Sequence, residues 1–162
     1  MSRTKVMVIG VGSRIRGDDS AGPCTIDLLE QLLSAGGPPK GFDIELMDAD
    51  VMPENFTKPM RESGADTVYF IDAVDMELQP GEIRRIPDEL IEETIPCSHN
   101  LPVSYVMGYV REKVPIVELI GDQVQTTGLF EVMTEEVKEG CSKLAKIILD
   151  GKALEVPMFS KE

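Results

Sequence analysis

Two carboxylates and one imidazole are the side chains of this sequence best suited to metal chemistry. Asp19 lies in a glycine-rich loop, Asp72 follows a strongly apolar run, and His99 is the only histidine. Such a set can bind zinc, nickel, iron or manganese and leaves coordination positions open. A structural zinc site usually has four protein ligands, so three ligands suit a transient or substrate-carried metal. A lone histidine in a polar loop is otherwise a surface or capping residue.

The acidic pair Asp18-Asp19 stands just before an expected helix. An aspartate there caps the helix and favours the positive end of its dipole, together worth about 1 kcal/mol. We assign that role to Asp18. A second acid beside the first is repelled unless a cation lies nearby, so Asp19 is the better candidate for a metal ligand.

The glycine-rich segment 10–22 invites a nucleotide-binding interpretation, which two known fingerprints test. A dinucleotide loop of the GxGxxG type requires a glycine where Ile15 stands. The GxxxxG interval of a P-loop is present, but Asp18 and Asp19 follow in place of Lys and Ser/Thr. Two carboxylates would repel a phosphate, so neither fingerprint fits.

Nucleophilic catalysis is the second chemical alternative. Cys97 stands two residues before His99, and a thiolate beside an imidazolium can be a nucleophile. Ser13, Ser20 or Ser98 could pair with His99 and an aspartate, but the GxSxG nucleophile elbow is absent. A thiol or serine hydrolase therefore has weaker support than a metal-contacting site.

Composition and charge restrict the class of protein. The 162 residues carry a formal net charge of −13, which disfavours binding to nucleic acid or to an anionic membrane surface. No apolar run approaches the roughly 20 residues that span a bilayer, and no secretory signal is recognisable. The cysteines Cys24, Cys97 and Cys141 lack CxxC spacing and are expected to be reduced thiols. We expect a cytoplasmic protein.

Strand and helix patterns alternate along the chain. Short apolar or alternating runs predict strands, and apolar residues at helical spacing predict helices. The expected strands cover residues 5–10, 43–47, 67–71, 82–86 and 116–120, with the direction of 82–86 left open, and the expected helices cover 23–36, 102–115 and 134–151. Alternation of this kind predicts a three-layer α/β/α sandwich around a mainly parallel twisted sheet. We expect one domain, 1–151, followed by a mobile tail, 152–162.

The predicted topology gathers the acidic residues at one edge. Ligands of such sheets bind outside the carboxyl ends of the strands. Asp48 and Asp72 each follow an expected strand, and the glycine-rich loop follows the first strand. The fold therefore predicts a carboxylate-lined site at that edge.

Several motifs together resemble one known family, the maturation endopeptidases of nickel-iron hydrogenases. The chain is most similar to those that serve the formate-linked hydrogenase and the deazaflavin-reducing hydrogenase of methanogens. The motifs are the loop from Gly10 to Pro23, Pro53-Glu54-Asn55 after Asp48, Ile71-Asp72-Ala73-Val74-Asp75-Met76 leading to Pro80-Gly81-Glu82-Ile83, and Ser98-His99-Asn100-Leu101-Pro102. The resemblance covers nearly the whole chain and implies a sheet of about five strands.

The resemblance also implies a function and particular residues. It implies removal of a C-terminal peptide from the hydrogenase large-subunit precursor after nickel insertion, with Asp19, Asp72 and His99 as metal-contacting and catalytic residues. Asp48 matches the aspartate associated with substrate recognition. The metal would be nickel carried by the substrate, with no tightly bound cofactor. The alternatives are a nickel-dependent chaperone that binds the precursor without cutting it and an acidic nucleotide-binding or flavodoxin-like domain.

Overall fold

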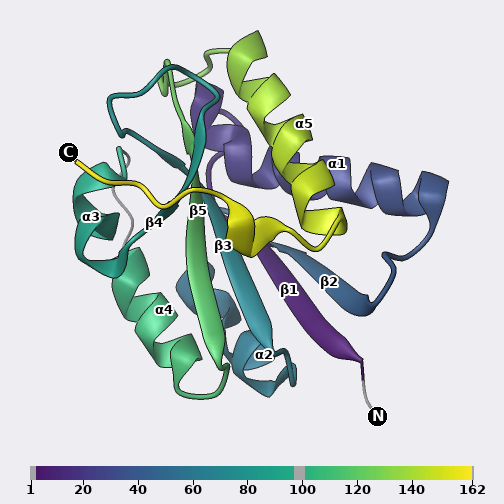
Figure 1. The fold of residues 1–162 in the computed structure, drawn as a ribbon. Coiled ribbons are helices and arrows are strands. Elements are labelled where there is room, and N and C mark those ends of the chain that lie inside the picture. The colour runs from purple at the N-terminus through teal and green to yellow at the C-terminus, as the bar shows by residue number, and fades with distance from the viewer. Residues whose placement is uncertain (1–2, 97–100, 162) are drawn as a thin grey trace.

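The computed structural model describes residues 3–96 and 101–161, which form an α/β sandwich (Figure 1). The strands are β1 (Thr4–Gly10), β2 (Phe42–Asp48), β3 (Thr67–Val74), β4 (Ile83–Ile86) and β5 (Ile116–Gln123). The helices are α1 (Ala21–Gly36), α2 (Thr57–Glu62), α3 (Ile91–Thr94), α4 (Val103–Arg111) and α5 (Glu135–Leu149), with short 3-10 turns η1 (Gly17–Ser20), η2 (Pro53–Phe56), η3 (Asp88–Leu90) and η4 (Ala153–Glu155).

The sheet has the strand order β2-β1-β3-β5-β4. All neighbouring pairs are parallel except β4 with β5, which is antiparallel. The central strand β3 is buried along its whole length, as expected of a parallel strand covered on both faces. The antiparallel pairing settles the direction of the segment 82–86, and the mainly parallel sheet confirms the predicted fold class.

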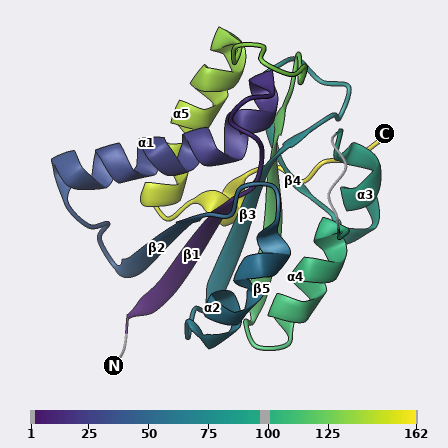
Figure 2. The ribbon, with the colours of Figure 1, turned by 180° about the vertical axis from the view of Figure 1, so that it is seen from behind.

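Helices cover both faces of the sheet (Figures 1 and 2). On one face, α1 and α5 pack together over a cluster that includes Ile26, Ile71 and Leu144. On the other, α2 and α4 cover a cluster that includes Phe70 and Met107. Side chains of a strand alternate between the two faces of a sheet. A polar residue of β3 or β5 therefore points to the same helix layer as the apolar residues two positions away in its strand.

Two strands extend beyond their expected ends. We expected strands to stop before Asp72 and at Gly121, but β3 continues to Val74 and β5 to Gln123. The two strands pair in register to their ends, with Asp72 opposite Gly121, and β4 pairs antiparallel with the end of β5. Hydrogen bonding to β3 on one side and to β4 on the other therefore extends β5 past Gly121.

The segment after Gly151, expected to be a mobile tail, packs along β4. Arg85 donates its N–H to the carbonyl of Pro157, and Phe159 donates its N–H to the carbonyl of Arg85. Val156 and Phe159 are buried. The mobility of this segment stays a prediction, which hydrogen exchange at the Arg85 and Phe159 amides would test. Over the described ranges, no helix has the length and apolar character needed to cross a membrane.

Candidate active site at the carboxyl edge of the sheet

The glycine-rich loop folds against itself and against the end of β3. A Cβ atom on Gly12, whose φ is 146°, would lie 1.9 Å from the carbonyl oxygen of Asp19. A Cβ atom on Gly22 would lie 2.5 Å from the carbonyl oxygen of Ile71. These two glycines therefore allow close backbone contacts within the protein, and they bring η1 next to the strand that carries Asp72.

Asp19 is a buried carboxylate at the end of this loop, with 2% of its surface exposed. Its Oδ2 atom accepts a hydrogen bond of 2.9 Å from the N–H of Ser13. The bond joins η1 to the chain that leaves β1. It fixes the carboxylate at the carboxyl edge of the sheet, where the sequence predicted it.

We had predicted that Asp18 caps α1, and this prediction is wrong. Its carboxylate instead binds the loop between β5 and α5. It accepts hydrogen bonds from the N–H groups of Gln125 at 2.8 Å, Thr126 at 3.1 Å and Thr134 at 2.7 Å. The hydroxyl of Thr134, the N-cap residue of α5, donates to the same carboxylate at 3.0 Å. The structural reason is that Asp18 belongs to η1 and Ser20 takes the N-cap position of α1.

Asp72 lies within β3 and is 1% exposed. Its Oδ1 atom accepts a hydrogen bond of 2.8 Å from the N–H of Ala73. Phe70 and Val74, which have the same parity in β3, pack in the cluster under α4. Strand alternation therefore points the Asp72 side chain toward the α4 layer.

Asp48 ends β2 and is bound by Arg14. The guanidinium of Arg14 donates to Asp48 Oδ2 at 2.7 Å and to both carboxylate oxygens of Asp27 at 2.7 and 3.0 Å. These two carboxylates raise the pKa of Arg14 above its ordinary value, so the arginine stays charged. An open pocket of about 540 Å³ lies here, lined by Arg14, Asp48, Ile15 and Phe56 among others.

His99 and Cys97 lie outside the described residues. Among residues 3–96 and 101–161, no three His, Cys, Asp or Glu side chains come together as a metal site. The chain on either side of 97–100 is placed: the N–H of Asp75, just beyond β3, donates to the carbonyl of Thr94 at 2.6 Å, and Pro102 precedes α4. The predicted ligand set therefore remains a prediction.

Asp122 is a buried carboxyl that the sequence analysis missed. It lies on β5 with the parity of Ile120, so it faces α1 and α5, away from the layer that Asp72 faces. Cys141 donates its S–H to Asp122 Oδ2 at 3.4 Å, and no described residue bonds to the buried Oδ1 atom. Burial raises the pKa of Asp122 to about 8.

Cys24 and Cys141 are free thiols whose side chains interact between α1 and α5. The hydrogen bond from Cys141 lowers the pKa of Cys24 to about 7, while the pKa of Cys141 is raised by its interaction with Cys24 and by burial. Cys24 packs beside the small cluster of Ala21, Ala73, Val137 and Cys141. These groups lie on the α1–α5 face and not with Asp72.

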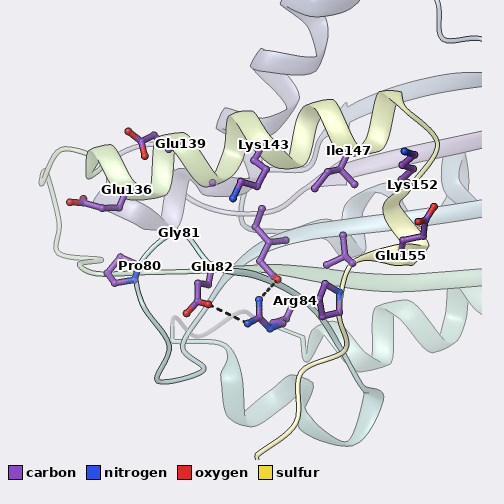
Figure 3. A pocket seen from close by; sticks show the side chains of 14 residues that line it. Pro80, Gly81, Glu82, Arg84, Glu136, Glu139, Lys143, Ile147, Lys152 and Glu155 are labelled. Atoms are coloured by element: carbon purple, nitrogen blue, oxygen red, sulfur yellow. Dashed lines mark hydrogen bonds and ion pairs between the residues drawn. The ribbon is translucent and has the colours of Figure 1, made fainter.

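A separate pocket of about 600 Å³ lies between α5, β4 and the C-terminal segment (Figure 3). Ile83, Ile147 and Val156 supply apolar surface, and Lys143 points from α5 toward β4. Glu82 pairs with Arg84 at 3.2 Å on the same rim. None of Asp19, Asp48 and Asp72 lines this pocket, so the candidate site is the edge described above.

Comparison with known proteins identifies the family. A family model described as hydrogenase maturation protease matches residues 26–151. The Hydrogenase 3 maturation protease of Escherichia coli (strain K12) is 34% identical over 134 residues, covering 82% of this chain and 81% of that protein. This chain belongs to the hydrogenase maturation protease family.

Solved structures of maturation proteases have the same fold. The crystal structure of the [NiFe] hydrogenase maturation protease HycI from Thermococcus kodakarensis KOD1 has 29% identity and a TM-score of 0.76, covering 93% of this chain and 94% of that chain. The solution structure of the endopeptidase HycI from Escherichia coli has 28% identity and a TM-score of 0.80, covering 98% of both chains.

The family membership establishes what kind of enzyme this is. The protein is an endopeptidase that processes a hydrogenase large-subunit precursor. The predicted family, fold class and enzyme class are confirmed.

Proposed function

We propose that this maturation endopeptidase removes a C-terminal peptide from a precursor that carries nickel, and that Asp19, Asp72 and His99 contact that nickel. The supporting observation is the position of two buried carboxylates at one edge of the sheet. Asp19 follows β1, Asp72 lies near the end of the neighbouring strand β3, and η1 packs against β3. Asp72 faces the layer of α4, the helix that follows residues 97–100.

The proposed donor set explains how the enzyme distinguishes a nickel-loaded precursor. Two carboxylates and one imidazole leave coordination positions for ligands that the precursor itself provides. An incomplete set binds the metal weakly without the precursor, so the enzyme needs no tightly bound cofactor of its own. Because the imidazole must be neutral to bind, recognition should weaken as the pH falls through the histidine range.

Asp48 has a proposed role in binding the peptide. Its carboxylate is already paired with Arg14, whose side chain is 51% exposed. An exposed pair of this kind contributes at most about 1 kcal/mol, so a basic group of the substrate could exchange with Arg14 at small cost. The pocket beside Asp48 provides room for the residues that precede or follow the cleavage point.

A cleavage assay with nickel-loaded precursor tests the ligand assignment. His99→Ala and Asp72→Asn should each lose processing, seen as the absence of a mobility shift, and should keep a folded circular dichroism spectrum. Asp88→Asn, which removes an exposed carboxylate paired with Arg111 near the amino end of β5, serves as the matched control. Full processing by His99→Ala would show that the assignment is wrong.

The same assay separates this chemistry from a thiol mechanism. Cys97→Ser should cleave within about tenfold of the parent, because a change beside the site costs at most about 1.4 kcal/mol of barrier. Near-complete inactivation of a folded Cys97→Ser protein would indicate a cysteine hydrolase, since loss of a nucleophile costs several orders of magnitude.

The cytoplasmic location predicted from the sequence also belongs to this proposal. Cys24 and Cys141 interact through their side chains and remain free thiols. Neighbouring thiols persist in reducing compartments, which supports a cytoplasmic site of action. Fractionation of cells with an antibody against this protein is the direct measurement.

A further inference from the structure

An exposed apolar patch lies beside the candidate site, on two segments that are far apart in the sequence. Ile15 comes from the loop after β1, and Leu129, Phe130 and Val132 come from the loop of residues 124–134 between β5 and α5. Their exposed fractions are 53%, 52%, 77% and 81%. Both segments follow strands at the carboxyl edge of the sheet, at the top of Figure 1. We refer to these four residues as the apolar patch.

The loop that carries the patch is held firmly to η1. Besides its bonds to the Asp18 carboxylate, the 124–134 loop forms backbone hydrogen bonds with η1. The N–H of Asp18 donates to the carbonyl of Thr126 at 2.8 Å, and the N–H of Gly17 donates to the carbonyl of Glu131 at 3.1 Å. The N–H of Phe130 donates to the carbonyl of Ile15 at 2.6 Å. The exposure of the patch is therefore built into the folded loop.

Phe130 has a strained backbone as well as an exposed side chain. Its φ is 63°, in the left-handed region that glycine and asparagine tolerate better than an aromatic residue. Its side chain is mostly exposed, so burial within this domain does not offset the strain. Exposed apolar surface and backbone strain at the same residue are features of binding sites.

The patch is continuous with the pocket at the proposed substrate site. Ile15 belongs to the patch and also lines the pocket that contains Asp48. A chain bound along that pocket would therefore reach Leu129 and Phe130 through Ile15. On the side of the 124–134 loop the surroundings are acidic, because Glu131, Glu135 and Glu136 are all exposed. On the side of Ile15, the exposed Arg14 is already paired with Asp27 and Asp48, and the whole chain has a net charge of −13.

We propose that the apolar patch is a docking surface for the hydrogenase large-subunit precursor, and that it binds an apolar area of the precursor bordered by basic side chains. The patch positions the precursor so that its cleaved end enters the pocket beside Asp48. It acts in binding and not in the chemical step. The inference rests on the proposed function, because it uses the same edge of the sheet as the substrate site.

Steady-state cleavage of nickel-loaded precursor by a double variant tests the proposal. Phe130→Asn with Val132→Ser removes most of the exposed apolar area, and asparagine suits the left-handed backbone at position 130. We expect KM to rise at least tenfold while kcat stays within twofold, with a melting temperature no lower than that of the parent. Leu154→Ser is the control, because Leu154 is exposed within η4, next to the amino end of β1, and should leave KM unchanged.

The outcomes distinguish the docking surface from the proposed function. Failure of the parent to cleave would refute the function, while co-sedimentation with the precursor would still report on the patch. An unchanged KM in the double variant, or a fall in kcat alone, would overturn the docking surface with the function intact. If the parent is a dimer and the double variant is not, the patch binds a second copy of this chain, and the docking surface for the precursor would also be overturned.

The KM of the parent should rise with ionic strength. A KM that does not depend on salt would contradict a basic border on the precursor.

Discussion

The buried carboxyl of Asp122 should make the protein less stable as the pH rises from acid to neutral. Burial raises its pKa from an ordinary value of 3.8 to about 8, and the nearby Asp18 carboxylate acts in the same direction. Below pH 4 both the folded and the unfolded state hold the proton. Between pH 4 and 8 the unfolded state releases it and the folded state keeps it, so the free energy of unfolding falls as the pH rises.

The magnitude follows from the difference between the two pKa values. Each pH unit within this window costs about 1.4 kcal/mol. Between pH 4.5 and 6.5 the expected loss from Asp122 is therefore about 3 kcal/mol. This range lies below the pKa of about 7 of Cys24, the neighbouring thiol, so titration of Cys24 adds little.

Urea unfolding of the parent and of Asp122→Asn at several pH values measures the effect. The amide does not titrate, so the stability of the variant minus that of the parent should grow by about 3 kcal/mol between pH 4.5 and 6.5. Any constant cost of placing an amide beside Gly140 cancels from this comparison. Asp88→Asn, whose carboxylate is 60% exposed, is the control and should change by only a few tenths of a kcal/mol. A difference that does not vary with pH would mean that Asp122 is ionised in the folded protein, and the reasoning would be wrong.

Three further predictions concern the loop and the thiols. Asp18→Ala should lower the free energy of unfolding by about 2–4 kcal/mol in urea, because hydrogen bonds to a charged group are each worth about 1.5–3 kcal/mol and the freed loop regains water; a loss under 0.5 kcal/mol would contradict this role. Gly12→Ala should destabilise by more than about 2 kcal/mol and reduce cleavage, because its Cβ would meet Asp19 at 1.9 Å; a parent-like melting temperature would argue against that contact. Cys24 should react with iodoacetamide near pH 7 faster than the buried Cys141, as peptide mass mapping would show, and equal rates would contradict the lowered pKa of Cys24.

The sequence was sufficient for the layers of the fold because each long element carries its own pattern. The continuous apolar run of β3 and the helical stripe of α5 are local signals, and both elements form at the predicted places, although β3 continues three residues past its apolar run. The short helices α2 and α3 escaped notice because four to six residues show no clear periodicity. The direction of β4 depends on a partner in β5 that lies far along the chain.

Two buried acids depend on distant contacts: Asp18, which the sequence analysis misassigned, and Asp122, which it missed. Asp18 has the local setting of a helix cap, yet its bonded partners lie 107 to 116 residues further on. Asp122 follows Gly121, which resembled the end of a strand. One signal was available: Gly140 lies inside α5, and an interior helix glycine often marks close packing. A Cβ there would lie 2.9 Å from the oxygens of the Asp122 carboxyl.

The adjacent residues Asp18 and Asp19 show how one short turn can join binding to chemistry. Asp19 bonds back to Ser13 beside β1, and Asp18 bonds forward to the loop that carries Phe130. Both side chains are buried, so neither can shift without breaking hydrogen bonds that have no solvent to replace them. These bonds of η1 therefore fix the 124–134 loop relative to Asp19, the carboxylate proposed to contact nickel. The acidic pair, expected to be a cap and a ligand, joins the 124–134 loop to the chain that leaves β1.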